Sequence, residues 1–213
     1  MYMPQHFQES RLDVLHKLIK KHPFGILVTN GRSGMDANHI PFELDVKCGE
    51  FGTLHAHVAR ANPLWKDVQN GDEVLAIFQA EHAYISPTWY PSKHESHKQV
   101  PTWNYMVVHA RGKVLIHDDE RYVRGMVARL TRTHEADQPQ PWKMTDSPKD
   151  FIDMMLKNIV GIEIPITQLA GKFKLGQNRE NRDIKGAGDA LKAQGDILLG
   201  QAMLDRIPAE PDK

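Results

Sequence analysis

The sequence is poor in cysteine, in excess charge and in long apolar runs, and each shortage excludes a class of protein. One cysteine, Cys48, among 213 residues allows no intramolecular disulfide and no thiolate-based zinc site. The 27 basic residues are balanced by 27 acidic ones, so no global field attracts nucleic acid or anionic membrane. No apolar stretch approaches the roughly 20 residues that span a bilayer, and the N-terminus lacks a signal-peptide pattern. We therefore expect a cytoplasmic protein with no membrane partner.

Several signatures of enzyme sites are also missing. The segment GKFKLG at residues 171–176 lacks the Gly-Lys-Ser/Thr ending of a phosphate loop. The glycines at 186 and 188 follow no predicted strand, so they make no dinucleotide fingerprint. His94 and His97 lie in a predicted loop without the Glu of a metalloprotease helix, which disfavours zinc. No Gly-x-Ser-x-Gly elbow is present, and we predict no catalytic residue and no metal site.

Aromatic residues concentrate in one segment, residues 83–105, which reads AYISPTWYPSKHESHKQVPTWNY. It holds three of the five tyrosines, two of the four tryptophans and three prolines. Its ends, residues 83–85 and 102–108, are strand-like, and the middle follows neither a strand nor a helix period. Rigid aromatics beside cations and amides suit a planar ligand with a polar edge, such as a flavin or haem. The alternative is a long hairpin loop with its aromatics folded onto the surface.

The period of the apolar pattern changes several times along the chain. Strands are predicted at residues 24–29 (closed by an Asn30-Gly31 turn), 38–44, 52–58, 73–78, 105–117 and 160–166. Helices are predicted before Pro23, at residues 62–68, from residues 118–120 through Leu130, from a Ser147 cap through Ile159, and weakly at residues 183–207. Hairpin spacing and grouped helices favour a mainly β protein, an antiparallel barrel with peripheral helices, over a doubly wound parallel sheet.

Two polar stretches at strand ends are candidate ligand sites. Alternation places His55 and His57 on one face of a strand, and Arg60 follows at the turn into a helix. A cation beside a helix start suits a phosphate, although Arg60 capping a surface beside satisfied histidines is the alternative. The second stretch, residues 172–179, gathers amides and cations after the last strand, and its alternative is a solvated basic tail.

Six sequence blocks, in order and at natural spacing, resemble one known family. They are MYMPQHF, PFGILVTNG, LHAHVARANPLW, IFQAEHAYISPTWYPSK, VPTWNYMVVHARGKV and GKFKLGQNR. Together they resemble the PaiB family of FMN-binding negative transcriptional regulators. This family belongs to the FMN-binding split-barrel superfamily, with pyridoxamine-phosphate oxidases and flavin reductases. The likeness covers residues 1–182, and Gly176 departs from the small polar residue expected in the closing block.

The resemblance implies a split-barrel domain at residues 1–182 and leaves residues 183–213 as a C-terminal helical tail. Four glycines in that tail each cost about 1 kcal/mol against alanine in a helix, so it needs a docking surface. The resemblance also implies a homodimer with FMN in the groove between its subunits. The implied FMN-binding residues are His57, Arg60 and Asn62 at the phosphate, His39 and Pro41 on a strand beside the isoalloxazine, and Trp103, Asn104, Lys174, Gln177 and Asn178 from the facing subunit.

Family membership leaves the function open, because this superfamily hosts several chemistries. The first hypothesis is a flavin-binding negative transcriptional regulator. The second is a flavin-dependent oxidoreductase, either a flavin reductase or similar to pyridoxamine-phosphate oxidase, and the third is a haem-binding protein. No helix-turn-helix is visible, and the local basic excess is confined to residues 172–185. DNA or another regulatory partner is therefore only weakly indicated.

Overall fold

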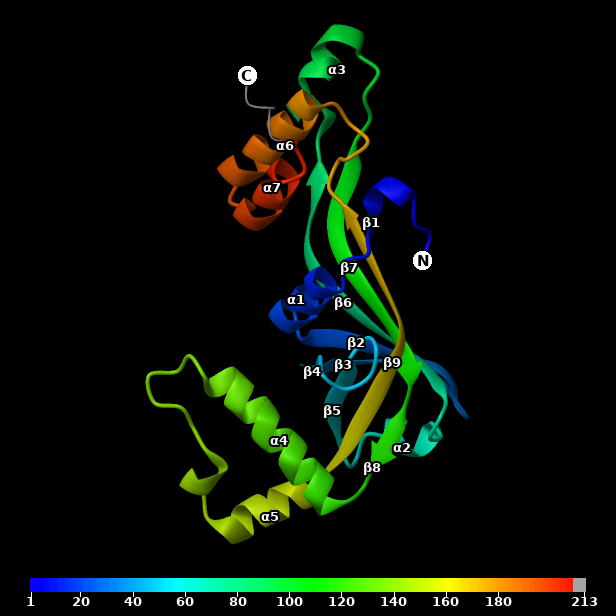
Figure 1. Ribbon diagram of the computed structural model, residues 1–213, viewed down its shortest axis with the longest axis vertical. Coiled ribbons are helices and arrows are strands. Elements are labelled where there is room, and N and C mark those ends of the chain that lie inside the picture. Colours follow the sequence, from blue (N-terminus) through cyan, green and yellow to red (C-terminus); the bar gives the residue numbers. More distant parts are fainter. Residues whose placement is uncertain (209–213) are drawn as a thin grey trace. The chain divides into compact units, whose positions relative to one another are not determined.

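The computed structural model describes residues 1–208, so the end of the predicted helical tail, residues 209–213, lies outside the described residues (Figure 1). Contacts divide the chain into two compact units. Unit 1 comprises residues 1–15, residues 79–108 and the chain from residue 170 onward; unit 2 comprises residues 16–78 and 109–169. The boundaries fall inside α1, β6, β7 and β9. The predicted division after residue 182 stays a prediction.

Nine strands of the described chain form one sheet, in the order β3-β2-β6-β7-β9-β5-β4, with β1 and β8 also pairing with β9. The strands are β1 (Gln8–Glu9), β2 (Phe24–Gly31), β3 (Gly34–Pro41), β4 (Glu43–Asp45), β5 (Thr53–Ala59), β6 (Glu73–Ile85), β7 (Thr102–Lys113), β8 (Leu115–His117) and β9 (Ile159–Lys174). The registers of β2 with β3, β4 with β5 and β5 with β9 are antiparallel. This agrees with the predicted antiparallel β architecture.

The first hairpin of unit 2 turns two residues later than predicted. Gly31 pairs with Gly34, so Arg32 and Ser33 form the turn rather than Asn30-Gly31. The Asp67 carboxylate accepts hydrogen bonds from the Ser33 N–H (2.9 Å) and hydroxyl (2.7 Å), and its carbonyl accepts from the Arg32 N–H (3.2 Å). The turn moves because a residue more than thirty positions away satisfies its donors.

The predicted strand at residues 38–44 is two strands. Residues up to Pro41 pair with β2, whereas Glu43–Asp45 pairs with β5. Between them the Phe42 N–H donates to the Pro23 carbonyl (2.9 Å), and the Phe42 ring packs edge-on against Phe78 at 5.4 Å in the core. Burial of this ring interrupts the strand. The connection from β4 to β5 carries the exposed Cys48.

The helices of unit 2 begin close to where the sequence predicts. The helices of the chain are α1 (Leu12–Lys21), α2 (Leu64–Asp67), α3 (Pro91–Ser96), α4 (Glu120–Glu135), α5 (Lys149–Lys157), α6 (Asn181–Ala193) and α7 (Ile197–Leu204). Asp119 caps α4 by accepting the Tyr122 N–H at 2.8 Å, whereas α5 has Pro148, not Ser147, as its N-cap residue. Val123 of α4 packs with Ile152 and Leu156 of α5.

Two strands run further than their apolar patterns predict. β6 has 13 residues and β9 has 16, whereas the strand predicted at residues 105–117 is divided between β7, which begins at Thr102, and β8. In the added parts of β6 and β9, residues 81–85 and 167–174, buried and exposed positions do not alternate strictly, so no strand period marks them in the sequence. The middle of the aromatic segment, predicted as a loop, contains a 3-10 helix (Pro87–Trp89) and α3.

The C-terminal segment of unit 1 forms two helices where one was predicted. Gly195 separates them with φ +97°, a conformation that favours glycine. Figure 1 shows α6 and α7 lying side by side. A Cβ on Gly200 would lie 2.6 Å from the Gly188 carbonyl oxygen, and one on Gly186 would lie 2.2 Å from the Trp89 carbonyl oxygen. The glycines that weaken the isolated helix therefore permit its close packing.

Candidate functional site

The predicted FMN-binding residues fall into one group in each unit. His39, Pro41, His57, Arg60 and Asn62 belong to unit 2. Trp103, Asn104, Lys174, Gln177 and Asn178 belong to unit 1. Within each group, some of these side chains lie on neighbouring elements, and others are hydrogen-bonded within their own segment or to another element.

Arg60, at the end of β5, is already bound to a carboxylate. Its Nη1 and Nη2 donate to the two oxygens of Asp118, at 3.0 and 2.5 Å, and its Nε donates to the Lys157 carbonyl at 2.5 Å. Arg60 in turn lowers the pKa of Asp118. The Arg60 and Asp118 side chains are 39% and 45% exposed, and such surface pairs are weak. A phosphate would have to share or displace Asp118, at modest cost.

Asn62 forms the turn that leads into the short helix α2, whose N-cap residue is Pro63. Asn62 Oδ1 accepts the Leu64 N–H at 2.9 Å, and Asn62 Nδ2 donates to Asn38 Oδ1 on β3 at 2.7 Å. The helix, α2, has four residues rather than the predicted seven, and Asn62 satisfies one of its N–H groups. Asn62 thereby joins the end of β5 to β3, the strand of His39 and Pro41. His39 is exposed on β3, and Pro41 is half-buried there.

His55 and His57 differ in their hydrogen bonds, although both belong to the face of β5 that the alternation predicts. His55 Nδ1 lies 2.8 Å from the Tyr122 hydroxyl, so His55 is satisfied by α4. His57 Nδ1 is buried and finds no partner among the described residues. Burial lowers the pKa of His57, which keeps its ring neutral near pH 7. A buried, unpartnered ring nitrogen is a position that a ligand hydrogen bond would satisfy.

Unit 1 gathers three cations whose described contacts are with neutral groups. Lys174 Nζ donates to Thr102 Oγ1 (2.5 Å) and the Trp103 carbonyl (2.8 Å). Lys172, only 8% exposed, donates to the Tyr2 carbonyl at 3.1 Å. Arg179 donates to Gln99. Burial, and then the charges of Lys172 and Arg179, lower the pKa of Lys174.

Aromatic rings lie beside two of these cations. Lys172 Nζ lies 5.5 Å from the ring centroids of both Tyr2 and Tyr105, and the Arg179 guanidinium lies 5.2 Å from that of Tyr90. Rings attract cations but do not neutralise their charge. The group, Lys172, Lys174 and Arg179, is hereafter the cation group. Lys172 begins the candidate stretch at residues 172–179 but was not among the FMN-binding residues that the resemblance implies, although its spacing of two from Lys174 on a strand places both on one face.

The other predicted residues of unit 1 have mixed positions. Trp103 is 53% exposed and meets Tyr84 edge-on at 6.3 Å, so two rings are available at the surface of β6 and β7. Asn104 is buried and donates to the sulfur of Met203 on α7 at 3.3 Å. Gln177 bonds the Leu175 N–H and the Phe173 carbonyl, which closes the turn at Gly176.

Gly176 and Asn178 complete that turn. Gly176 has φ +93°, which explains why glycine replaces the small polar residue expected there. Asn178 is exposed. In this turn, therefore, the side chain of Asn178 is exposed, whereas the side-chain amide of Gln177 is hydrogen-bonded within the turn.

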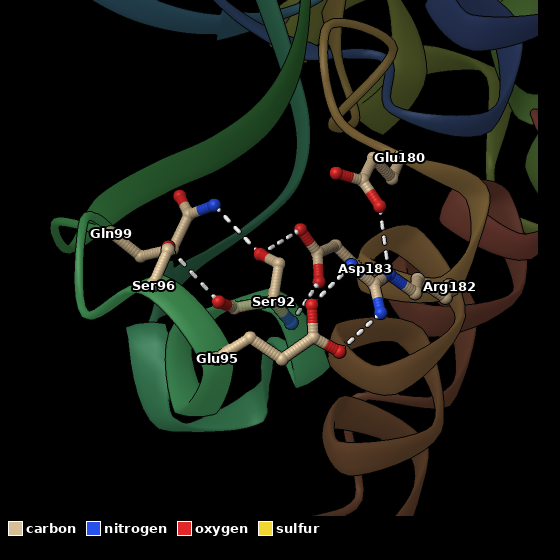
Figure 2. A network of polar contacts seen from close by, with 7 residues as sticks. All are labelled: Ser92, Glu95, Ser96, Gln99, Glu180, Arg182 and Asp183. Atoms are coloured by element: carbon tan, nitrogen blue, oxygen red, sulfur yellow. Dashed lines mark hydrogen bonds and ion pairs between the residues drawn. The ribbon is translucent and has the colours of Figure 1, made fainter.

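Helix α6 holds the aromatic segment in place within unit 1. Figure 2 shows the buried Asp183 of α6 accepting the Ser92 N–H at 3.0 Å and the Ser92 hydroxyl at 2.6 Å. Gln99 Nε2 donates to Ser92 Oγ at 2.8 Å, so the start of α3 and the chain that follows α3 are both connected to the Asp183 carboxylate through Ser92. Arg182 bonds both Glu95 and Glu180. The C-terminal tail, which lies outside the family resemblance, thus positions the aromatic segment, which lies inside it.

The chain matches a known family model over residues 1–168, and that family is described as "Putative FMN-binding domain". The protein "Protease synthase and sporulation protein PAI 2" of Bacillus subtilis is 32% identical over 193 residues, which cover 90% of this chain and 89% of that protein. An uncharacterized protein of Aspergillus fumigatus is 30% identical over 240 residues, covering 92% of each chain. These matches confirm the predicted PaiB family and a flavin as the cofactor of that family.

The fold is similar to that of solved flavoproteins. The FAD and heme binding protein from Mycobacterium smegmatis superposes with a TM-score of 0.59 at 14% identity, covering 80% of this chain and 74% of that one. At this identity the likeness concerns the fold alone, and it confirms the predicted mainly β split barrel with helices. In the described part of the chain, no helix has the length and apolarity needed to cross a bilayer.

Proposed function

The chain belongs to this family of FMN-binding domains, and from that premise we propose that it is a PaiB-type flavin-binding regulator. In this proposal it lowers the expression of target genes in the cytoplasm, with FMN occupancy as its signal. The observation that carries the proposal is the cation group, in which Lys172, Lys174 and Arg179 contact neutral groups and aromatic rings. Positive charge of this kind, not compensated in its described contacts, is suited to an anionic ligand.

The residues present fit FMN in both of its parts. The phosphate needs cations or N–H donors, which the cation group supplies at the C-terminal end of β9. The planar ring system needs apolar faces and hydrogen bonds at its polar edge. Tyr84 and Trp103 offer exposed rings, and the buried Nδ1 of His57 is a polar atom without a partner in the described chain.

We assign the phosphate to the cation group first and to Arg60 second. Arg60 has an internal carboxylate partner, whereas Lys174 is held by a hydroxyl and a carbonyl. His39, Pro41, His57 and Asn62 remain proposed ring and ribityl neighbours, and Trp103, Asn104, Gln177 and Asn178 remain proposed contacts from the facing subunit. FMN, when bound, supplies hydride and electron transfer; the residues named here bind and orient it.

Two observations support a regulator over an oxidoreductase. The B. subtilis relative carries a name that refers to protease synthesis and sporulation. In unit 1, the aromatic segment is tied to α6 through Asp183, which favours a fixed cover over an open path for a nucleotide. We do not propose that the protein itself recognises a DNA operator, because its net charge is zero. We expect a regulatory partner protein to contact the DNA instead.

Flavin binding and reduction together test the proposal. We expect FMN to titrate the purified protein saturably, with the flavin absorption spectrum perturbed on binding. We also expect NADH and NADPH to reduce the bound FMN far more slowly than the roughly 1–1000 per second of a catalytic step. Stopped-flow mixing under nitrogen measures this rate. Saturable reduction within that range would favour the oxidoreductase, and a Soret band with no flavin binding would favour the haem protein.

We further propose that the protein is a homodimer with FMN contacted by both subunits. Exposed rings such as Trp103 are typical of surfaces that a partner covers. Sedimentation of the wild-type protein at micromolar concentration should give about twice the chain mass. A monomer that binds FMN tightly would contradict the shared site.

A further inference from the structure

A cavity of about 530 Å³ lies in unit 2 between the C-terminal half of α4 and the chain that follows it. Figure 1 shows this chain looping away from the end of α4 toward α5. Ala128 and Met144 line the cavity together with Trp142, which is 41% exposed. Its volume lies within the range of small-molecule sites, roughly 300–1,000 Å³. None of the proposed FMN-binding residues lines it.

Two of the three charged residues that line this cavity are cations. Arg132 of α4 and Lys143 of the following chain both line it. Neither side chain belongs to an ion pair found in the described part of the chain. The lining also includes Glu135, whose Oε2 accepts the Trp142 N–H at 2.9 Å. Glu135 thus ties the loop that carries Trp142 to the helix, whereas Arg132 and Lys143 line the same cavity with no carboxylate at ion-pair distance in the described chain.

We propose that this cavity binds a small aromatic carboxylate. The ring of the ligand packs against Trp142 and Met144, where aromatic and thioether contacts are favourable. Its carboxylate lies between Arg132 and Lys143, where charge-assisted hydrogen bonds are available. An apolar interior beside two cations selects an aromatic acid over a neutral aromatic of the same shape. The proposal does not depend on the proposed function, because it uses no residue of the FMN site.

Calorimetric titration of the full chain with 2-naphthoate tests this site, with 2-naphthalenemethanol as the neutral probe of matched shape. We expect saturable binding of one naphthoate per chain and weaker binding of the alcohol. The double variant Arg132→Gln/Lys143→Gln should lose at least about tenfold in naphthoate affinity and leave the alcohol unchanged. Trp142→Ala should weaken both probes. The matched control, Arg121→Gln, changes an exposed cation of α4 that does not line the cavity and should leave both affinities unchanged.

Three results would overturn the proposal. The first is equal wild-type affinity for acid and alcohol, or no binding of either. The second is displacement of naphthoate by FMN, which would place the probe in the flavin site. The third is a double variant that keeps its naphthoate affinity but sediments with a changed mass, which would mark the surface as an interface between copies. Failure of FMN binding itself, measured separately, would affect only the proposed function.

Discussion

Two strand ends in this chain carry cations that suit a phosphate, and they differ in what already occupies those cations. At the end of β5, Arg60 binds Asp118 through two nitrogens. At the end of β9, Lys172 and Lys174 bond carbonyl and hydroxyl oxygens, and Lys172 lies near two aromatic rings. The charge of Arg60 is already paired with a carboxylate. Lys172, which is buried, and Lys174, which is half-buried, have no described carboxylate partner and therefore favour an incoming anion. The comparison shows that a local run of basic residues in a sequence does not reveal which of its cations is better suited to bind an anion.

The largest expected effect comes from removing both lysines. Lys172→Met/Lys174→Met should weaken FMN binding by at least about 100-fold, because two charge-assisted contacts to the phosphate disappear. Fluorescence titration with FMN measures the loss. Riboflavin, which lacks the phosphate, is the control ligand and should bind both proteins alike. An unchanged FMN affinity in a folded double variant would remove the cation group from the site.

The anchor of the aromatic segment should matter next. Asp183→Ala leaves the Ser92 N–H without its buried acceptor, which costs about 1–3 kcal/mol of unfolding free energy. Urea denaturation measures this loss, and FMN affinity should fall as the segment loosens. Asp189→Ala, an exposed acid on the same helix, is the control. A destabilised variant with full FMN affinity would show that the segment does not contact the flavin.

The pH dependence of binding should separate the two strand ends. Burial lowers the pKa of Lys174 below its ordinary 10.5. Lys174 therefore loses its proton as the pH rises toward 10.5, and the FMN phosphate then loses a cationic partner. The same shift makes the folded chain bind its proton less well than the unfolded chain, so this group's contribution to stability decreases as the pH falls through the folded pKa. FMN affinity should therefore decrease from pH 8 to 10 more steeply in the wild type than in Lys174→Arg. Parallel profiles would contradict the role of Lys174.

The smallest expected effect concerns Arg60. Arg60→Gln should change FMN affinity by less than about fivefold, because a pair with Asp118 at the surface already satisfies the guanidinium. Asp118→Asn should then strengthen FMN binding slightly if the phosphate approaches Arg60 at all. The same fluorescence titration decides both. A loss of 100-fold in Arg60→Gln would reverse the ranking and place the phosphate at the end of β5.

Local signals in the sequence predicted much of the fold. Asp119 begins α4 as an acidic N-cap. The spacing of Leu12, Leu15, Leu18 and Ile19 predicts one apolar helix face, and in α1 the last three are buried whereas Leu12 is exposed. The first hairpin turn was misplaced because Asp67 satisfies its donors from a distance. The lengths of β6 and β9 were underestimated because buried and exposed positions do not alternate strictly in the later part of either strand.

The candidate site was predictable to the level of segments. The blocks around Arg60, Trp103 and Lys174 were found by composition and by family resemblance. Neither signal shows that Asn104 faces Met203, that Gln177 closes its own turn or that Lys172 is buried between two rings. Those facts depend on which side of an element meets which neighbour, and a pattern of residue types does not specify the neighbour.

By itself the sequence determined the family, the alternation of the strands, the starts of the main helices and the supply of cations and rings, because each depends on residues close together in the chain. The tertiary structure alone decided how those residues are used. Asp118 lies 58 positions from Arg60, and Asp183 lies 91 positions from Ser92. Whether a cation is neutralised or left for a ligand depends on such distant partners, because the energy of a charge is set by the groups around it in space and by its burial.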